Sequence, residues 1–399
     1  MRVLLVNDYG TPTGGAEAFM LTLRRQLCAL GHDARLFSTT ARPLDVPIEA
    51  DDTCVGTTSP FRTLLQCANP WAARSLRTVL DEFRPDVVHV KLFLTQLSPL
   101  ILPVLRDVPA IYSVADYRPI CPTSTRQLPS GRACHEAVGP ACYREGCLPL
   151  RDWLPVMAQM RLWAEWRGAF DRITVASDWM RQRLAASGLA ADLVVPNGVP
   201  RRPQRPPLSG PPTVGFAGRL VSTKGVDVLL DAFARVRRTI PDARLLIAGD
   251  GPERGALERR ATALGVADAV AWTGHVERGA LEEVLAPAWV QAAPSTWAEP
   301  FGLVAAEAMM RGTAAVVSRS GGLAEIVDDG ETGYTVLPSD ADALATALVS
   351  VLGDRQRAER MGSAGRVRAE RLYTDAICVD RFLDLYREVQ AAPRVAAHD

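Results

Sequence analysis

Short runs of Val, Ile and Leu recur along this chain of 399 residues, and between them lie longer segments whose apolar residues have helical spacing. The strand-like runs cover 3–7, 33–38, 87–93, 110–115 and 172–177 in the first half, and 213–218, 244–249, 269–274, 290–294, 314–318 and 333–337 in the second. Runs that stay apolar throughout are typical of parallel strands covered by helices on both faces. The alternation therefore predicts an α/β protein with one parallel sheet in each half.

A proline-rich stretch separates the two halves. Residues 199–212 read VPRRPQRPPLSGPP, which neither a helix nor a central strand can accommodate, so we expect a linker. The length suits two domains of about 200 residues each. We place the first domain at 1–196 and the second at 197–371, and we expect a last helix with an apolar stripe within 372–399.

The charge balance argues against a nucleic-acid partner. Lys and Arg number 45, Asp and Glu also number 45, and the two signs are interleaved along the chain. No stretch approaches the ~20 apolar residues that cross a bilayer, and the first apolar run is too short for a signal peptide. We expect a cytoplasmic protein.

Lysine is rare in this chain. Of the 45 basic residues only Lys91 and Lys224 are lysine. A lysine kept against such a bias suggests a need for a compact point charge, although chance survival is the alternative.

The segment EPFGLVAAE carries two acids on either side of a predicted helix start. Glu299 precedes the helix and Glu307 lies inside it, so both can face one ligand. One carboxylate can accept hydrogen bonds from sugar hydroxyls and the other from a ribose diol, while the free N–H groups of Phe301, Gly302 and Leu303 meet the polar groups between. Two solvated acids on a surface helix are the alternative.

A second segment, VGFAGRLVSTKG, supplies cations at a strand-to-helix junction. Gly218 and Arg219 follow an apolar strand, and Lys224 precedes Gly225 and an amphipathic helix. Fixed positive charges at a helix start are what a diphosphate requires.

These two segments resemble the donor site of the retaining glycosyltransferases of family 4, and the resemblance covers nearly the whole chain. It implies the GT-B fold, in which two Rossmann-like domains face each other across a cleft, and a last helix that crosses back to the N-terminal domain. It also implies that Arg219 and Lys224 hold the diphosphate of a nucleoside-diphosphate sugar without a catalytic metal, that Glu307 binds the ribose and that Glu299 binds the sugar. The acceptor would be a glycan, a lipid-linked molecule or a small molecule.

Two further segments belong to this interpretation. In the segment NDYGTPTGGAE, Gly14 and Gly15 let the backbone approach a phosphate or sugar closely. Their spacing is not the G-x-G-x-x-G of dinucleotide-binding enzymes, which argues against a dehydrogenase. The resemblance implies that the backbone after Gly274 contacts the nucleobase, which points to Val276.

The first half departs from the family. Many relatives carry a His-Asp pair where this chain has Ala115 and Asp116. Lys91, at the end of the strand VVHVKLF, could bind an anionic group of the acceptor, compensate for the missing His or form a salt bridge to Asp116. His89 could be packed in the core or face the cleft. Other functions stay open: a sugar-nucleotide epimerase or hydrolase, with Asp116 as its acid or base, or a sugar-nucleotide-binding protein that has lost catalysis.

Four cysteines fall within one segment that has little hydrophobic periodicity. Cys121, Cys134, Cys142 and Cys147 span an insertion that cannot build a core and so needs a cross-link. We expect these thiolates to bind a structural zinc ion. Because the spacing contains no C-x-x-C, free thiols or an iron–sulfur cluster remain as alternatives.

Aromatic and basic residues share one predicted helix at 153–170. Such a helix either packs inside its domain or makes peripheral contact with a membrane that carries a lipid-linked acceptor.

Overall fold

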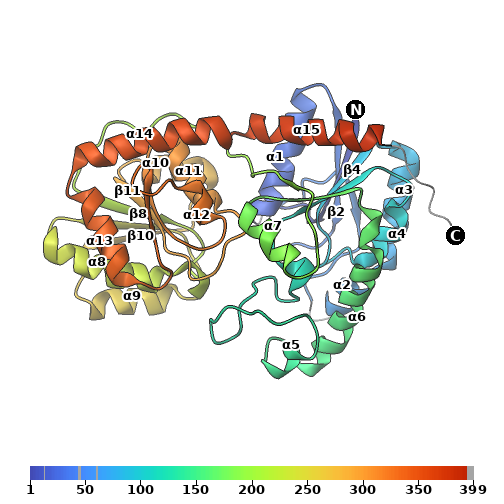
Figure 1. Ribbon diagram of the computed structural model, residues 1–399, viewed down its shortest axis with the longest axis horizontal. Coiled ribbons are helices and arrows are strands. Elements are labelled where there is room, and N and C mark those ends of the chain that lie inside the picture. Colours follow the sequence, from blue (N-terminus) through green and yellow to red (C-terminus); the bar gives the residue numbers. More distant parts are fainter. Residues whose placement is uncertain (13, 44–45, 60–61, 393–399) are drawn as a thin grey trace. The chain divides into compact units, whose positions relative to one another are not determined.

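The structure is a computed structural model that describes residues 1–12, 14–43, 46–59 and 62–392 (Figure 1). The chain forms two compact units, each with its own parallel sheet. Unit 1 runs from Met1 to Gly198 and takes in the chain again from Ala376, and unit 2 is Val199–Asp375. The expected α/β class with one parallel sheet in each half is confirmed.

Unit 1 contains a parallel sheet with the strand order β3-β2-β1-β4-β5-β6-β7. Its strands are β1 (Arg2–Tyr9), β2 (Asp33–Thr39), β3 (Asp52–Cys54), β4 (Val87–Leu92), β5 (Ala110–Val114), β6 (Arg172–Val175) and β7 (Leu193–Val194). Its helices are α1 (Gly15–Ala29), α2 (Arg62–Cys67), α3 (Pro70–Phe83), α4 (Leu102–Leu105), α5 (Ala141–Arg144), α6 (Leu150–Trp166), α7 (Asp178–Ala185) and α15 (Asp375–Ala391).

The last helix completes the core of unit 1. Phe382 and Tyr386 of α15 share one hydrophobic cluster with Val3 and Leu5 of β1. Figure 1 shows α15 beside α1, and the rings of Phe19 and Phe382 meet there with their centroids 6.0 Å apart. The apolar stripe at the end of the chain therefore contributes to the folding of the first half.

Unit 2 contains a parallel sheet with the order β10-β9-β8-β11-β12-β13. Its strands are β8 (Thr213–Ala217), β9 (Arg244–Ala248), β10 (Val270–Gly274), β11 (Val290–Ala293), β12 (Ala314–Ser318) and β13 (Gly333–Val336). Its helices are α8 (Val226–Thr239), α9 (Arg254–Ala263), α10 (Arg278–Leu285), α11 (Leu303–Arg311), α12 (Leu323–Ile326), α13 (Ala341–Leu352) and α14 (Arg355–Leu372).

Short 3-10 helices connect these elements in both units. They are η1 (Pro99–Ile101), η2 (Arg118–Ile120), η3 (Arg167–Ala169), η4 (Ser222–Lys224) and η5 (Ala267–Ala269).

The proline-rich stretch forms neither helix nor strand. It belongs to unit 2 and packs against other residues of that unit. The Arg205 side chain donates to the carbonyl oxygen of Gly312 at 3.1 Å and forms an ion pair with Glu359 at 2.9 Å. The amide N–H of Leu208 donates to the same carboxylate at 2.7 Å. These bonds fix the segment along α14.

In each unit the strand order reverses once, between β1 and β4 in unit 1 and between β8 and β11 in unit 2. Ligands of open α/β sheets bind at such a switch point, beyond the carboxyl ends of the strands. The residues that follow β1, β4, β8 and β11 are therefore the candidates for a site.

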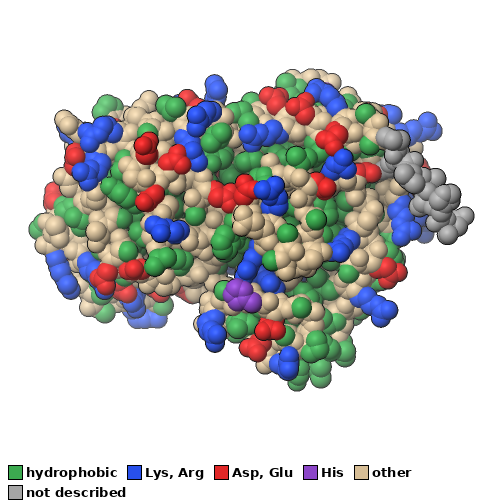
Figure 2. Space-filling view, in the orientation of Figure 1, with side chains coloured by type: hydrophobic (Ala, Val, Ile, Leu, Met, Phe, Trp, Pro, Cys, Tyr) green, Lys and Arg blue, Asp and Glu red, His purple; other side chains and the backbone are tan. Residues whose placement is uncertain are grey.

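The face drawn in Figure 2 carries side chains of both charges. Basic and acidic side chains are mixed over the face drawn in Figure 2, consistent with the zero net charge. Among the described helices, none combines the length and the apolar character that crossing a bilayer requires.

Candidate functional site

An ion pair stands at the switch point of unit 2. Lys224 comes from the loop after β8 and Glu299 from the loop after β11, and the Lys224 Nζ lies 2.7 Å from the Glu299 Oε1. The Glu299 side chain is 8% exposed and that of Lys224 is 28% exposed. A buried acid thus holds a half-buried cation at the carboxyl edge of the sheet. Open α/β sheets generally bind their ligands at this edge.

Close backbone packing joins the two loops that carry this pair. The amide N–H of Thr296 donates to the carbonyl oxygen of Thr223 at 2.9 Å. Gly225, with φ of +64°, ends the first loop, and a Cβ at this position would lie 2.1 Å from the carbonyl oxygen of Pro294. Only glycine fits there, so the loops can approach closely enough for the ion pair to form.

Two further bonds orient Glu299. The Ser295 hydroxyl donates to the Glu299 Oε1, and the amide N–H of Gly322 donates to the Glu299 carbonyl oxygen at 2.8 Å. Ser295 is buried, and the sequence interpretation missed it. Its place four residues before Glu299 in the same loop was the available signal.

Helix α11 begins four residues after Glu299, and its start offers unpaired amides within the described part of the chain. Gly302 caps the helix with φ of +110°, and the amide N–H groups of Phe301, Gly302 and Leu303 donate no hydrogen bond within the described part of the chain. The Phe301 ring is buried against Tyr373, with the centroids 5.7 Å apart, so the loop is anchored from behind. These amides and the helix dipole create a positive electrostatic potential at this end.

The other predicted residues of unit 2 occupy the same edge of the sheet. Leu303 and Glu307, four residues apart on α11, are both half-buried and share one face of the helix. The Gly218 amide bonds to the carbonyl oxygen of Ala248 at 3.0 Å and closes the turn after β8.

Arg219 lies in the loop directly after β8, whereas Val276 lies two strands to the side. The Arg219 side chain is exposed, and no ion pair or hydrogen bond joins it to another described residue. Val276 is half-buried just beyond β10, which lies two strands from β8, about 10 Å to the side.

Unit 1 holds the other lysine at its own switch point. Lys91 lies at the end of β4 and is 2% exposed. Its Nζ sits 3.9 Å from the centre of the Phe19 ring and 3.5 Å from the Asn197 Oδ1, and no ion pair to Asp116 forms among the described residues. Burial lowers the pKa of Lys91 to about 8, opposed by the nearby Cys378 and Glu17.

A buried acid near Lys91 was missed by the sequence interpretation. Glu17 lies in the first turn of α1 and is 8% exposed. The pKa of Glu17 is raised to about 7, mainly by burial. The charges of Asp8 and Asp116 act in the same direction, and a backbone hydrogen bond and the Lys91 charge oppose them. The available signal was its position as the acid in the first turn after Gly14 and Gly15, which are both exposed.

The two acids beside Glu17 have different environments. Asp8 is fully buried and accepts hydrogen bonds from the amides of three consecutive residues after β4, at 2.8–2.9 Å, so it holds that loop. Asp116 accepts from the Arg118 amide at 2.8 Å, and burial raises its pKa while the Arg118 guanidinium lowers it.

His89 and Trp163 both lie in the core of unit 1. The sequence left alternatives open for His89 and for the helix at 153–170, which contains Trp163. The His89 Nδ1 is 2.6 Å from the Tyr386 hydroxyl, and the His89 ring is fully buried. Trp163 is 2% exposed and packs against Phe93, Tyr112 and Phe170. The side of α6 that carries Trp163 is therefore packed inside unit 1.

Two family models match consecutive parts of the chain. The model of Glycosyltransferase Family 4 matches residues 13–202, and the model of glycosyl transferases group 1 matches residues 201–368. The chain belongs to glycosyltransferase family 4. The predicted family is thereby confirmed, and Lys224, Glu299 and the start of α11 all lie in the part matched by the group 1 model.

Relatives within this family include a glycogen synthase of Mycobacterium tuberculosis, 40% identical over 46% of this chain and 45% of that protein. A GDP-mannose-dependent alpha-(1-6)-phosphatidylinositol monomannoside mannosyltransferase of Mycolicibacterium smegmatis is 38% identical over 49% of this chain and 56% of that protein. The chain thus spans about half the length of the curated relatives it matches.

The GT-B fold of the family is found along nearly the whole chain. Sucrose-phosphate synthase from Thermosynechococcus elongatus matches with a TM-score of 0.75 and 24% identity, over 98% of this chain and 100% of that one. The expected GT-B fold is confirmed by this match together with the seven- and six-stranded parallel sheets.

Proposed function

We propose that this member of family 4 is a metal-independent retaining glycosyltransferase, which moves a sugar from a nucleoside-diphosphate sugar to an acceptor hydroxyl. The observation that carries the proposal is the Lys224–Glu299 pair at the switch point of unit 2, next to the unpaired amides at the start of α11. A cation, an acid and free N–H groups within one loop cluster suit a ligand that has both a diphosphate and a sugar.

Lys224 and Arg219 bind the diphosphate in this proposal. An ammonium has three N–H donors, and the contact to Glu299 uses one of them, so the others remain for phosphate oxygens. Arg219 adds a guanidinium whose fork fits a phosphate with two hydrogen bonds. Negative charge develops on the leaving phosphate in the transition state, where fixed cations lower the barrier.

The acids and amides bind the two ends of the donor. Glu299 accepts hydrogen bonds from the sugar hydroxyls, and the amides of Phe301, Gly302 and Leu303 donate to them. Glu307 accepts from the ribose diol. Val276 lies to the side of the pair, where the nucleobase would extend.

Transfer with retention requires that the leaving phosphate and the acceptor oxygen lie on the same face of the sugar. The bond between the anomeric carbon and the β-phosphate oxygen breaks, and a new bond forms from the acceptor oxygen to the anomeric carbon on the same face. The acceptor proton passes to the departing phosphate, so no separate base is required. In unit 1, Gly14 and Gly15 let the backbone approach a bound substrate, while Lys91 and Asp116 orient the acceptor.

The acceptor is a glycan, a lipid-linked molecule or a small molecule. The names of the relatives guide the choice of test acceptors, since one is a glycogen synthase and another a phosphatidylinositol monomannoside mannosyltransferase.

Incubation with UDP- and GDP-sugars and a panel of glucan, phosphatidylinositol-type and small hydroxyl acceptors tests the function. We expect acceptor-dependent release of nucleoside diphosphate, a product whose anomeric configuration equals that of the donor by NMR, and unchanged transfer in EDTA while the protein stays folded. Release of free or altered sugar without an acceptor would identify a hydrolase or epimerase instead. Binding without turnover of any donor would identify a sugar-nucleotide-binding protein, and loss of transfer in EDTA with the fold intact would contradict metal independence.

A further inference from the structure

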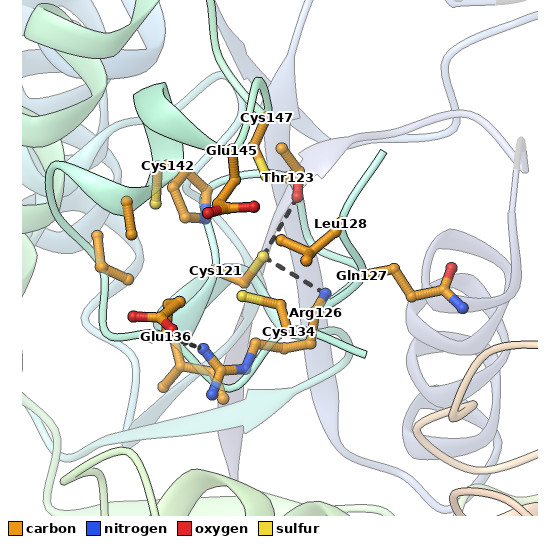
Figure 3. Close-up of a pocket in the computed structure, with 14 residues that line it drawn as sticks. Cys121, Thr123, Arg126, Gln127, Leu128, Cys134, Glu136, Cys142, Glu145 and Cys147 are labelled. Atoms are coloured by element: carbon orange, nitrogen blue, oxygen red, sulfur yellow. Dashed lines mark hydrogen bonds between the residues drawn. The ribbon is translucent and has the colours of Figure 1, made fainter. Parts of the chain in front are cut away.

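Four of the eight cysteines line one small pocket in unit 1. Cys121, Cys134, Cys142 and Cys147 stand around it in Figure 3, with the sulfur atoms of Cys121 and Cys134 next to one another in this view. All eight cysteines are free thiols. The pocket has a volume of about 20 Å³, enough for one water-sized species.

Three separate turns of the chain bring these thiols together. Cys121 ends the 3-10 helix η2. Cys134 closes a hairpin turn, because its amide donates to the Arg126 carbonyl oxygen at 2.7 Å. Cys142 lies in α5 and Cys147 just after it, where the Leu148 amide donates to the Cys142 carbonyl oxygen at 3.0 Å. Thiols up to 26 positions apart in the sequence therefore line the same pocket.

The segment has almost no core of its own. Between Cys121 and Cys147 only Cys121, Pro122 and Ala141 are buried. A stretch of this length with three buried residues gains little stability from the hydrophobic effect, and small scaffolds of this kind are held by disulfides or a metal.

Two neighbouring groups fix the position of the Cys121 sulfur. Its Sγ accepts a hydrogen bond from the Arg126 amide at 3.4 Å and lies 3.2 Å from the Thr123 Oγ1. Hydrogen bonds to the sulfur of a metal ligand orient it towards the metal.

We propose that Cys121, Cys134, Cys142 and Cys147 bind one structural Zn²⁺ ion, with four thiolates as its ligands. Four soft sulfur ligands select zinc or an iron–sulfur cluster over Mg²⁺ or Ca²⁺, and a pocket for one water-sized species suits a single ion better than a cluster. Among the described residues, no group of three or more Cys, His, Asp or Glu side chains already stands close enough to hold a metal. The sulfur atoms therefore move towards the pocket centre on binding, and the zinc joins η2, the hairpin and α5.

The zinc would also stabilise the wall of a larger cavity in unit 1. Ile120, Arg126, Glu136 and Val138 line both the thiol pocket and a neighbouring cavity of about 550 Å³, whose opposite wall is α6. Loss of the metal would thus disturb this cavity as well as the loop.

Elemental analysis of the full chain, purified without added metal, tests the proposal. We expect about one zinc per chain. The variant Cys134→Ser with Cys147→Ser should lose the metal, and Cys28→Ser, which removes an exposed thiol on α1, should keep it. Iron and sulfide in place of zinc, or a folded wild type that holds no metal, would overturn the proposal.

Two measurements on the wild type do not depend on the folding of variants. A strong zinc chelator should make four more thiols reactive for each zinc released and should lower the melting temperature. Replacement of zinc by Co²⁺ should give the visible absorption of a tetrahedral site with thiolate ligands. Two disulfides found by thiol titration, or a chelator without effect on thiol reactivity, would contradict four-thiolate binding.

Discussion

Each unit holds one of the two lysines of the chain at the point where its strand order reverses. Lys224 is half-buried and paired with an acid, whereas Lys91 is buried over an aromatic ring without an ion pair among the described residues. Every other Lys or Arg position of the chain is arginine. Each lysine lies among packed residues of its own unit, where a compact ammonium fits better than a planar guanidinium.

The variants Lys224→Ala and Arg219→Ala should each weaken the binding of UDP or GDP by about 10- to 100-fold, because a charged hydrogen bond contributes roughly 1.5–3 kcal/mol. Isothermal titration calorimetry measures the effect. Arg238→Ala, which removes an exposed arginine of α8, serves as the control and should bind as the wild type does. Unchanged affinity in either variant would remove that residue from the site.

The variant Lys91→Arg should keep nucleotide affinity but lose transfer, because the proposed donor contacts lie in unit 2 and a larger, planar guanidinium would replace the compact ammonium over Phe19. Circular dichroism and calorimetry control for fold and donor binding. Adding Ala115→His to this variant should recover part of the activity or change the preferred donor. Wild-type transfer rates in Lys91→Arg would show that Lys91 is a structural charge only.

The variant Glu17→Gln should be more stable than the wild type above pH 7 and equally stable below about pH 4.5. The folded-state pKa of Glu17 is about 7, above its usual value of 4.5, so the folded protein binds more protons across this window and loses stability as the pH rises through it. The variant has no such loss, and the difference should reach up to about 3 kcal/mol. Urea unfolding at pH 4.5, 6 and 8 measures it. A difference that does not depend on pH would contradict a buried, protonatable Glu17.

At the scale of elements, the hydrophobic pattern was enough to locate the long strands. All eleven expected runs form strands of the two sheets, because a buried parallel strand must be apolar along its whole length. The strands β3 and β7 were missed: β3 reads Asp-Thr-Cys and β7 has only two residues. Edge pairings of this size leave no periodic signal, since they are set by the neighbouring strand instead of by their own residues.

The close contact between the loops after β8 and β11 leads to a prediction for Gly225. Gly225→Ala should lower both the melting temperature and nucleotide affinity, because a Cβ would meet the Pro294 carbonyl oxygen at 2.1 Å. Gly265→Ala is the matched control: its φ is +71°, but nothing lies within 4 Å of the added Cβ. Backbone strain alone costs about 1–2 kcal/mol at both positions. Equal destabilisation by the two substitutions, or unchanged nucleotide affinity in Gly225→Ala, would contradict the role of this loop contact.

At the scale of the whole molecule, motif residues could be predicted and their supporting partners could not. Lys224 and Glu299 were recognised from short segments, but nothing in those segments reveals that the side chains meet across 75 positions of sequence. Asn197 contacts Lys91 from 106 positions away, and Glu17 is surrounded by groups from three other elements. Such neighbours are determined by the sheet order, which a single sequence does not display.

Hydrogen exchange of the full chain with and without saturating UDP or GDP tests most directly whether unit 2 binds the nucleotide at its switch point. We expect slower exchange at the amides of 218–225 and 301–307, where the loop cations and the unpaired N–H groups of α11 would contact the ligand, and little change at 121–147. Protection confined to unit 1, or no protection by either nucleotide, would contradict a donor site at the Lys224–Glu299 pair.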